Sequence, residues 1–394
     1  MDRTQLQAYR AVYHEELYSR VMPFWLRHSL DHEFGGYLNC LDRDGTPFDT
    51  TKHVWLQGRQ VWMMSRLHNA HHGPGESSAW LDAAKLGADF LRKYARGDNN
   101  RVYFALNRDG SPNFLQRKMF AECFYVMAMA EYARATGDAS AHAEAEEVFG
   151  HVLEFARNPR LLGKPDYSTG LPASELAVPM ILLNLIEELN GPEGTGWDDV
   201  SKWCVSRIDL HYRPELKLVL ETVGGDGSLI DSPAGRLVNP GHAIECGWFL
   251  MNYGRKIGDR GLVEKALNMI DWSYDYGWDK EFGGLLYFLD REGFSPTQLE
   301  WNMKLWWPHC EALVAFMMAY EETGKAEYLE KFRQVHDYSF QRFSDPEFGE
   351  WFGYLDRRGE MSQRFKGGPY KGCFHVPRAL FLVEESIKRI LAKG

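Results

Sequence analysis

The sequence predicts an all-α fold: an (α/α)6 barrel of twelve helices with short β-hairpins in the connecting loops. Three observations predict it. A turn motif recurs along the chain, its copies are spaced about 65 residues apart, and the segments between copies have the periodicity of two helices each. A repeat of this length is typical of an architecture in which each unit is completed by its neighbours.

The turn motif is clearest in three places. Residues 31–45 (DHEFGGYLNCLDRDG), 279–293 (DKEFGGLLYFLDREG) and 345–359 (DPEFGEWFGYLDRRG) share the pattern D-x-E-F-G-(G/E)-x-x-x-x-L-D-R-x-G. Fainter copies lie at 101–110 and 216–227. Alternating apolar and aromatic residues between glycines are typical of a short strand pair closed by a tight turn. We expect the recurring Asp-Arg pairs to fasten each turn to its neighbour.

The glycines that close these copies recur at a nearly constant interval. One interval is almost twice the others, which predicts a degenerate copy near 165–172. The chain then holds six units of roughly 60–66 residues, which together account for nearly all of its 394 residues. The closing glycines are Gly45, Gly110, Gly227, Gly293 and Gly359.

The segments between the turns have apolar residues at helical spacing and end at Gly or Pro. Twelve helices make six helical hairpins, which we expect to close into one domain over 1–394. An open solenoid is the alternative, but it requires polar capping repeats, and the terminal helices here are as apolar as the middle ones. The predicted helices cover 5–28, 53–70, 78–95, 118–136, 140–157, 174–189, 197–212, 240–257, 261–276, 303–323, 326–343 and 372–391.

Composition excludes several classes of protein. The net charge is −10, and no run of Lys and Arg offers a face for nucleic acid. The longest nearly uncharged apolar run, 176–186, is too short to span a bilayer, and the polar N-terminus has no signal-peptide core. The six cysteines are scattered without a CxxC pair, which indicates reduced thiols, no zinc site and a cytoplasmic protein.

Polar residues interrupt the apolar starts of the predicted inner helices. Burying such groups is unfavourable unless they are paired or used, so a ring of them at one mouth of the barrel is a candidate active site. Helix N-termini at the same mouth add positive potential, which favours an anionic intermediate. The residues that keep the repeat period are Arg59, Glu122, Met180, His242, His309 and His375.

Each of these residues also has a structural explanation. A single His is usually a hydrogen-bonded core residue, but His242 and His375 occupy matching repeat positions, which favours catalysis. Arg59 can act on substrate or pair with a carboxylate. The same alternatives apply to the carboxylates and tryptophans expected to contact substrate or to fill the core: Glu122, Glu245, Glu311, Trp55 and Trp306.

Two reaction classes suit this ring. Glycoside hydrolysis needs two carboxylates on either side of the scissile bond, and Glu122, Glu245 and Glu311 can supply them. Inversion at a carbon next to a carbonyl needs a base on each face and a cation for the enediolate oxygen. Two imidazoles titrate near neutral pH and suit that task, so His242 and His375 with Arg59 favour the second class.

Several longer motifs resemble those of the N-acylglucosamine 2-epimerase family, whose animal members are also called renin-binding proteins. The resemblance covers essentially the whole chain. Its motifs are WLQGRQVW (55–62), AVPMILLNL (177–185), NPGH-x-I-E-x-GWF (239–249), QLEW-x-x-KLWWPH-x-E (298–311), DPEFGEWFGYL (345–355) and KGCFHVPR (371–378).

The resemblance implies an (α/α)6 barrel that interconverts N-acetylglucosamine and N-acetylmannosamine in sialic acid metabolism, as a homodimer activated by ATP or another nucleotide that is not consumed. It implies that His242 and His375 transfer the protons, that Arg59 contacts the sugar, and that Glu245 and Glu311 assist. Cellobiose 2-epimerases and aldose–ketose isomerases share the fold and remain alternatives; the cellobiose enzymes have a histidine where Met180 stands.

The nucleotide site that the resemblance implies has only part of its motif in this sequence. The family's phosphate loop falls on 158–168, where Lys164 is present, but Pro165 stands where Ser or Thr should bind magnesium. The incomplete motif favours a plain surface loop over a nucleotide site for this segment. Renin binding is a further expectation if the chain comes from an animal. No metal ligand set, nucleic-acid partner or membrane partner is predicted.

Overall fold

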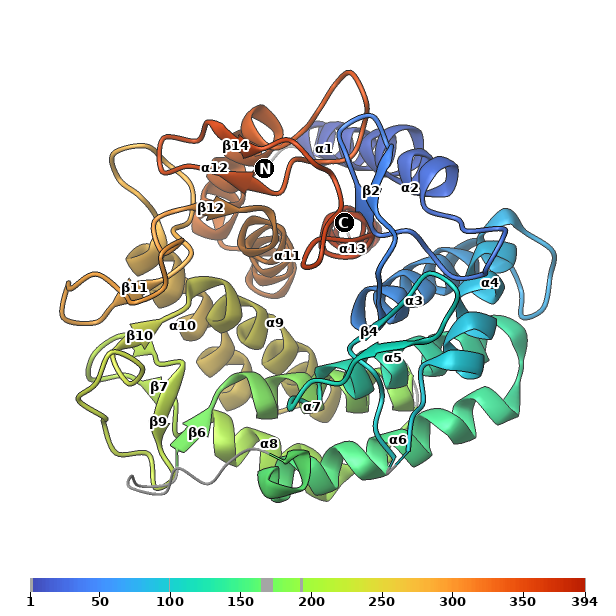
Figure 1. Cartoon of the computed structure of the whole chain (residues 1–394). Coiled ribbons are helices and arrows are strands. Elements are labelled where there is room, and N and C mark those ends of the chain that lie inside the picture. Colours follow the sequence, from blue (N-terminus) through green and yellow to red (C-terminus); the bar gives the residue numbers. More distant parts are fainter. Residues whose placement is uncertain (1–2, 99, 164–172, 192–193, 394) are drawn as a thin grey trace.

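Two concentric rings of helices form the fold. The structure is a computed structural model that describes residues 3–98, 100–163, 173–191 and 194–393. The helices of the inner ring surround one central axis (Figure 1). They are α3 (Val54–His71), α5 (Phe120–Thr136), α7 (Ala177–Asn190), α9 (Pro240–Ile257), α11 (Trp306–Thr323) and α13 (His375–Lys393).

The outer ring covers the seams between inner helices. Its first member is continuous through a π-helical turn, η1, and an outer helix such as α10 buries one stripe, with Leu262, Ala266 and Met269 at helical spacing. Inner helices such as α5 are buried almost all round. The outer helices are α1–η1–α2 (Arg3–Glu15, Glu16–Val21, Met22–His28), α4 (Ala79–Tyr94), α6 (Ala139–Arg157), α8 (Asp198–Ile208), α10 (Arg260–Gly277) and α12 (Ala326–Arg342).

The first and last helices close the ring. Helix α1 packs against α13, and α13 also packs against α11. Side chains complete the seam to α3, where the Arg66 guanidinium lies over the Phe381 ring at 5.9 Å. The barrel is therefore closed, which confirms the sequence prediction over the open solenoid.

The predicted helices are confirmed, with shifts of a few residues at their ends. Short strands take the residues where the sequence prediction ran too long. The helix predicted over 303–323 begins at Trp306 because Lys304–Leu305 form β12, and the helix predicted over 197–212 ends at Ile208 shortly before β7. A strand ladder satisfies the same backbone groups as a helical turn, so helical periodicity alone cannot place this boundary.

The connecting loops hold small antiparallel sheets of two or three strands, as predicted. Strand pairs follow the order β1–β2, β3–β4–β5, β6–β9, β7–β8, β10–β11 and β12–β13–β14. The degenerate copy predicted near 165–172 lies outside the described residues. The strands are β1 (Cys40–Leu41), β2 (Pro47–Asp49), β3 (Lys52–His53), β4 (Ala105–Leu106), β5 (Pro112–Phe114), β6 (Ala173–Glu175), β7 (Tyr212–Arg213), β8 (Leu218–Val219), β9 (Thr222–Gly224), β10 (Leu237–Val238), β11 (Leu289–Asp290), β12 (Lys304–Leu305), β13 (Tyr354–Leu355) and β14 (Met361–Gln363).

A buried Lys-Asp-Arg group recurs three times between neighbouring loops. The aspartate that opens each clear copy of the turn motif accepts from a fully buried lysine and from an arginine of the adjacent turn. Of the three L-D-R arginines expected to fasten turns, Arg43 and Arg357 do so in this way, whereas Arg291 bonds Glu292 and the Gly235 carbonyl instead. The Asp-Lys distances are 2.9, 3.0 and 2.9 Å. The three groups are Asp31 with Lys52 and Arg108, Asp279 with Lys304 and Arg357, and Asp345 with Lys366 and Arg43.

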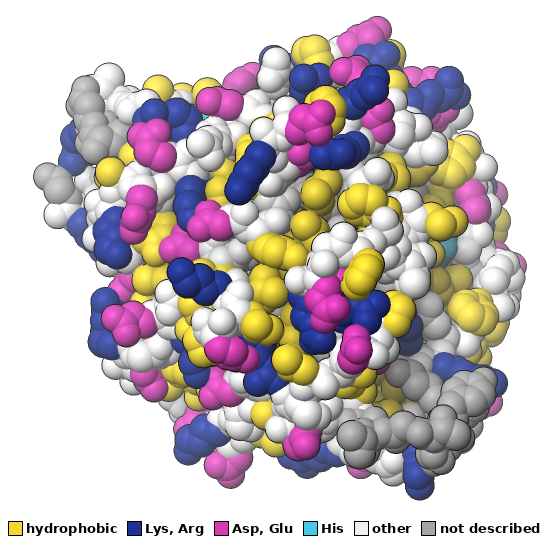
Figure 2. All heavy atoms as spheres, turned by 90° about the vertical axis from the view of Figure 1, so that its left-hand side faces the viewer, with side chains coloured by type: hydrophobic (Ala, Val, Ile, Leu, Met, Phe, Trp, Pro, Cys, Tyr) yellow, Lys and Arg dark blue, Asp and Glu magenta, His cyan; other side chains and the backbone are white. Residues whose placement is uncertain are grey.

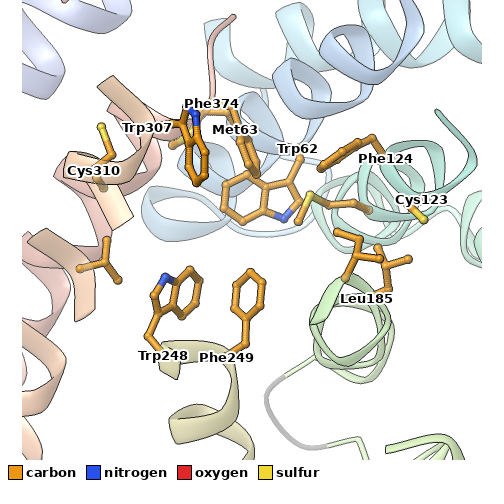
Figure 3. Close-up of a cluster of buried hydrophobic side chains, with 14 of the residues drawn as sticks. Trp62, Met63, Cys123, Phe124, Leu185, Trp248, Phe249, Trp307, Cys310 and Phe374 are labelled. Carbon is orange, nitrogen blue, oxygen red and sulfur yellow. The ribbon is translucent and has the colours of Figure 1, made fainter. Parts of the chain in front are cut away.

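Aromatic side chains fill the interior of the barrel. Figure 3 shows Trp248 and Phe249 from α9, Phe124 from α5 and Trp307 from α11 turned toward its centre. All six cysteines are free thiols and are buried. Burial raises the pKa of every one of them, so they stay protonated at neutral pH.

The outer surface in Figure 2 carries basic and acidic side chains interspersed around apolar ones. Charges of mixed sign make no strong field on this face. In the described part of the chain, we find no helix with the length and apolar character needed to cross a membrane.

Candidate active site

A cavity of about 880 Å³ opens at the end of the barrel where the inner helices begin. That volume lies in the range of small-molecule sites. The N-termini of α3, α9, α11 and α13 lie at this end, so their dipoles add positive potential. Among the side chains that line the cavity are most of those predicted for the site: Trp55, Arg59, Met180, His242, Glu245, Trp306 and His375.

His242 lies in the first turn of α9. The Asn239 side chain caps this helix by accepting from the His242 backbone N–H at 3.2 Å. The His242 Nδ1 lies 3.0 and 3.2 Å from the two carboxylate oxygens of Glu221. Burial lowers the pKa of His242, but the charge and hydrogen bond of Glu221 outweigh this, so its pKa is raised above the ordinary value.

His375 begins α13 and has a different environment. Its Nδ1 lies 2.7 Å from Oε1 of Glu311, and the same oxygen accepts from Nη2 of Arg378 at 2.6 Å. Arg378 also donates to Glu245 at 2.7 Å. Burial, followed by the charges of Arg59 and Arg378, lowers the pKa of His375 well below the ordinary value.

Arg59 reaches the cavity between aromatic rings. Its guanidinium carbon lies 4.1 Å from the Phe124 ring centroid, 4.8 Å from Trp55 and 5.0 Å from Phe374. Burial lowers the pKa of Arg59 to about 9, against the opposing attraction of Glu245. Stacking of this kind holds a cation at a fixed position in an apolar wall.

One cluster has the donors of a metal site. Glu245, Glu311 and His375 offer ligand atoms that all lie within 4.8 Å of one another. The guanidinium of Arg378 already bonds both carboxylates at 2.7 and 2.6 Å. The positive charge at the centre of this cluster is therefore Arg378, and we assign no metal to it.

Comparison with known proteins assigns the family. The family model of N-acylglucosamine 2-epimerase (GlcNAc 2-epimerase) matches residues 36–181 and 211–379. The chain belongs to the N-acylglucosamine 2-epimerase family. N-acylglucosamine 2-epimerase from Bos taurus is 48% identical over 385 residues, covering 95% of this chain and 90% of the bovine one. The human N-acylglucosamine 2-epimerase is 44% identical over 403 residues, covering 100% of this chain and 93% of its own.

Solved structures agree on the fold of this N-acylglucosamine 2-epimerase family chain. Cellobiose 2-epimerase from Spirochaeta thermophila superposes with a TM-score of 0.81 at 23% identity, covering 99% of each chain. A D-mannose isomerase gives 0.80 at 19% identity and covers 98% of each chain. At these identities the likeness shows the barrel fold alone.

Three residues that we expected to contact substrate in this family member do not line the cavity: Glu122, His309 and Glu311, whose carboxylate bonds His375 and Arg378. Glu122 is fully buried and pairs with Arg101 at 2.7 Å while accepting from the Val102 backbone N–H. His309 is fully buried, with Nδ1 bonded to the Leu305 carbonyl and Nε2 accepting from the Leu285 N–H. Glu122 and His309 each accept from a loop backbone N–H, so both side chains are engaged away from the cavity.

The repeat period places Glu122 and His309 level with Arg59, but in the structure they occupy the position of Gln57, two residues earlier. Gln57 performs the same task as Glu122 and His309, because its side chain accepts from the Tyr37 backbone N–H at 2.8 Å. A shift of two residues rotates a side chain about 200° around a helix, from the inner face to the outer one. Arg59 therefore corresponds to Glu311, which does reach the histidine at the cavity.

Sequence reasoning about this family member missed two charged residues. Glu221 directly precedes β9, and its carboxylate lies beside His242 of α9 only in the folded chain. Arg378 lies one turn after His375 on the same inner helix, but the sequence does not show which carboxylates it meets. Lys164, the candidate for nucleotide binding, lies outside the described residues.

Proposed function

We propose that the chain is an N-acetylglucosamine 2-epimerase that interconverts N-acetyl-D-glucosamine and N-acetyl-D-mannosamine by deprotonation and reprotonation at C2. One observation carries this proposal: two imidazoles line one cavity, and each has its Nδ1 bonded to a carboxylate. With Nδ1 engaged, Nε2 is the nitrogen left for proton transfer. The names of the bovine and human relatives support the choice of substrate.

The proposed reaction begins with the open-chain aldehyde. One histidine removes the C2 proton, and the electrons move onto the carbonyl oxygen O1 to give an enolate whose C2 carries the acetamido group. The Arg59 cation, supported by the helix N-termini, stabilises the negative charge on O1. The other histidine then donates its proton to the opposite face of C2, which inverts that carbon and restores the aldehyde.

The geometry argues against glycoside hydrolysis at this cavity. Inverting hydrolysis needs carboxyl groups roughly 6.5–9.5 Å apart, and retaining hydrolysis needs about 5–5.5 Å with the scissile bond between them. Glu245 and Glu311 instead bond the same nitrogen of Arg378, so the space between them is occupied. Glu122, the third candidate carboxylate, is bonded to Arg101 away from the cavity.

Incubation with N-acetylmannosamine in heavy water tests the proposal. We expect N-acetylglucosamine that carries one deuterium at C2, detected by sugar chromatography and mass spectrometry. His242→Asn and His375→Asn should each lower turnover by about 10²–10⁴ without loss of the fold. Near-native turnover of either variant, or product without label at C2, would refute the two-base mechanism.

The same assay distinguishes the related sugars. Cellobiose, mannose and N-acetylmannosamine are offered to the enzyme in parallel at equal concentration. We expect the N-acyl sugar to give the highest kcat/KM. Faster conversion of cellobiose or mannose would instead assign another aldose 2-epimerase or an aldose–ketose isomerase.

The remaining expectations are also proposals. We propose a cytoplasmic homodimer that serves sialic acid metabolism, uses no consumed cofactor, and is activated by ATP or another nucleotide; renin binding applies if the source is an animal. Turnover with and without ATP tests the activation, and sedimentation tests the dimer. Retention of full turnover without any nucleotide would refute activation while leaving the epimerase assignment intact.

A further inference from the structure

The two histidines of the cavity each bond a glutamate, but the two carboxylates differ in how many other donors they bind. In the described structure, the Glu221 carboxylate has His242 as its one hydrogen-bond partner, so its negative charge acts on that imidazole. The Glu311 carboxylate, by contrast, also accepts from Arg378 at 2.6 Å and from the Trp248 indole at 2.9 Å. The Arg378 cation offsets the negative charge of this carboxylate, so it favours a proton on His375 less than Glu221 favours one on His242.

We propose that Glu221 and Arg378 are positioning residues that give the resting enzyme one fixed acid–base pair, with His242 as the imidazolium and His375 as the neutral base. This inference rests on the proposed epimerase function, which it deepens. Glu221 is not among the residues that line the cavity, whereas Arg378 lines it next to His375. Each acts through the histidine beside it.

The charged groups around each ring agree with this assignment. His242 faces three carboxylates, Glu221, Glu245 and Glu311, all of which favour its cation. Its ring also packs against the indole of Trp307, with centroids 5.2 Å apart. Its pKa is accordingly raised although burial opposes this.

His375 is in the reverse situation. Burial and the cations Arg59 and Arg378 oppose a proton on this ring most strongly. Glu245 attracts a proton less strongly than these, and His242 adds a smaller opposing effect. Its pKa lies well below the ordinary value. The ring contacts Trp307 as well, with centroids 5.9 Å apart, so both histidines lie beside the same indole.

The assignment gives the reaction a preferred starting direction. The epimer that presents its C2–H to His375 meets a ready base, and the Nε2 proton of His242 goes to the opposite face. After this step His375 carries the proton and His242 is neutral, so the total number of protons on the pair is unchanged. The pair returns to rest when His375 releases its proton to water and His242 takes one up.

Nitrogen-15 NMR of the histidine-labelled full chain tests the inference without turnover. At about pH 6.5, the ordinary histidine pKa, we expect imidazolium shifts for His242 and neutral shifts for His375. His242→Asn and His375→Asn assign the signals. In Glu221→Gln the carboxylate is lost, so His242 should become neutral at that pH.

Kinetics supply the second measurement. In Glu221→Gln the alkaline limb of the kcat/KM profile should move to lower pH by about one unit or more, because the acid loses the charge that holds its proton. Glu215→Gln is the matched control: it removes the same charge from an exposed turn of the same loop and should leave the profile unchanged. Thermal unfolding checks that both variants are folded.

The outcomes separate this inference from the proposed function. Neutral His242 in the unmodified enzyme, or unaltered titration and pH profile in Glu221→Gln, would overturn the inference and leave the epimerase activity standing. Absence of turnover with every sugar, together with the expected NMR shifts, would refute the function instead.

Discussion

Arg43 and Asp345 lie 302 positions apart in the sequence, yet their side chains form a doubly bonded ion pair at 2.7 and 3.0 Å. Asp345 opens the last clear copy of the turn motif and Arg43 lies in the first. The pair therefore fastens the last unit of the barrel to the first. The same bond joins neighbouring units at Asp31 with Arg108.

Removal of Asp345 should destabilise the fold more than removal of its arginine. Asp345→Asn leaves the fully buried Lys366 without a counter-charge, so we expect the free energy of unfolding to fall by about 3–5 kcal/mol. Arg43 is 37% exposed, so Arg43→Met should lower it by about 0.5 kcal/mol. Urea denaturation measures both, with Arg364→Met as the exposed control. Equal effects of the two changes would contradict the dominance of the buried lysine.

Acid should weaken the closed barrel through the same aspartates. Burial raises the pKa of Asp31 and Asp279, but their bonds to lysine and arginine lower it below the ordinary value. Their stabilisation is therefore complete above the unfolded pKa of about 3.9 and is lost as pH falls through the lower folded values. We expect the urea midpoint to drop steeply below about pH 4, and less steeply in Asp345→Asn.

Amide substitution should affect stability at Glu122, which lies outside the cavity, and catalysis at Glu245, which lines it. Glu122→Gln weakens the bond to Arg101 outside the cavity, so the melting temperature should fall while kcat and KM stay the same. Glu245→Gln loses a charge-assisted bond to Arg378 worth about 1.5–3 kcal/mol, which should lower kcat roughly tenfold or more. Steady-state kinetics and calorimetry on both variants make the comparison. A large loss of kcat in Glu122→Gln would restore that residue to the site.

Arg59→Lys should make activity sensitive to pH. The environment that lowers the pKa of Arg59 to about 9 acts equally on a lysine, whose ordinary pKa is lower. Lysine then loses its proton near neutral pH, so the variant should retain activity in acid and lose it as pH rises. Measurement of kcat/KM from about pH 6 to pH 9 checks this. A profile parallel to that of the unmodified enzyme would show that charge at this position is not required.

The sequence predicts the fold well because each unit of the repeat can be checked against the other units. Helices, turns and the closing glycines all recur at one period, so an error in one unit is corrected by the others. The inner-helix face is harder, because it depends on the position of each helix to within one residue. Gln57 and Arg59 illustrate this: they are two positions apart, and one bonds the Tyr37 backbone while the other faces the cavity.

Contacts between side chains that are far apart in the sequence cannot be predicted from the residues around each of them. Glu221 lies in a weak copy of the motif, and nothing around it indicates that its carboxylate meets His242. The bond of Arg378 to Glu245 joins residues 133 positions apart. Such contacts depend on the three-dimensional arrangement of the helices, so they can be identified only from the structure.

Alkylation of the six buried cysteine thiols can detect local unfolding at six places in the barrel. A thiol reacts with an alkylating reagent only as the thiolate, and burial keeps these groups protonated and covered. Each label therefore records an opening event at its own place, from Cys40 in β1 to Cys373 before α13. The order in which mass spectrometry finds them modified maps which part of the barrel opens first. The alkylation rate of each cysteine therefore measures how often its own part of the barrel opens to solvent.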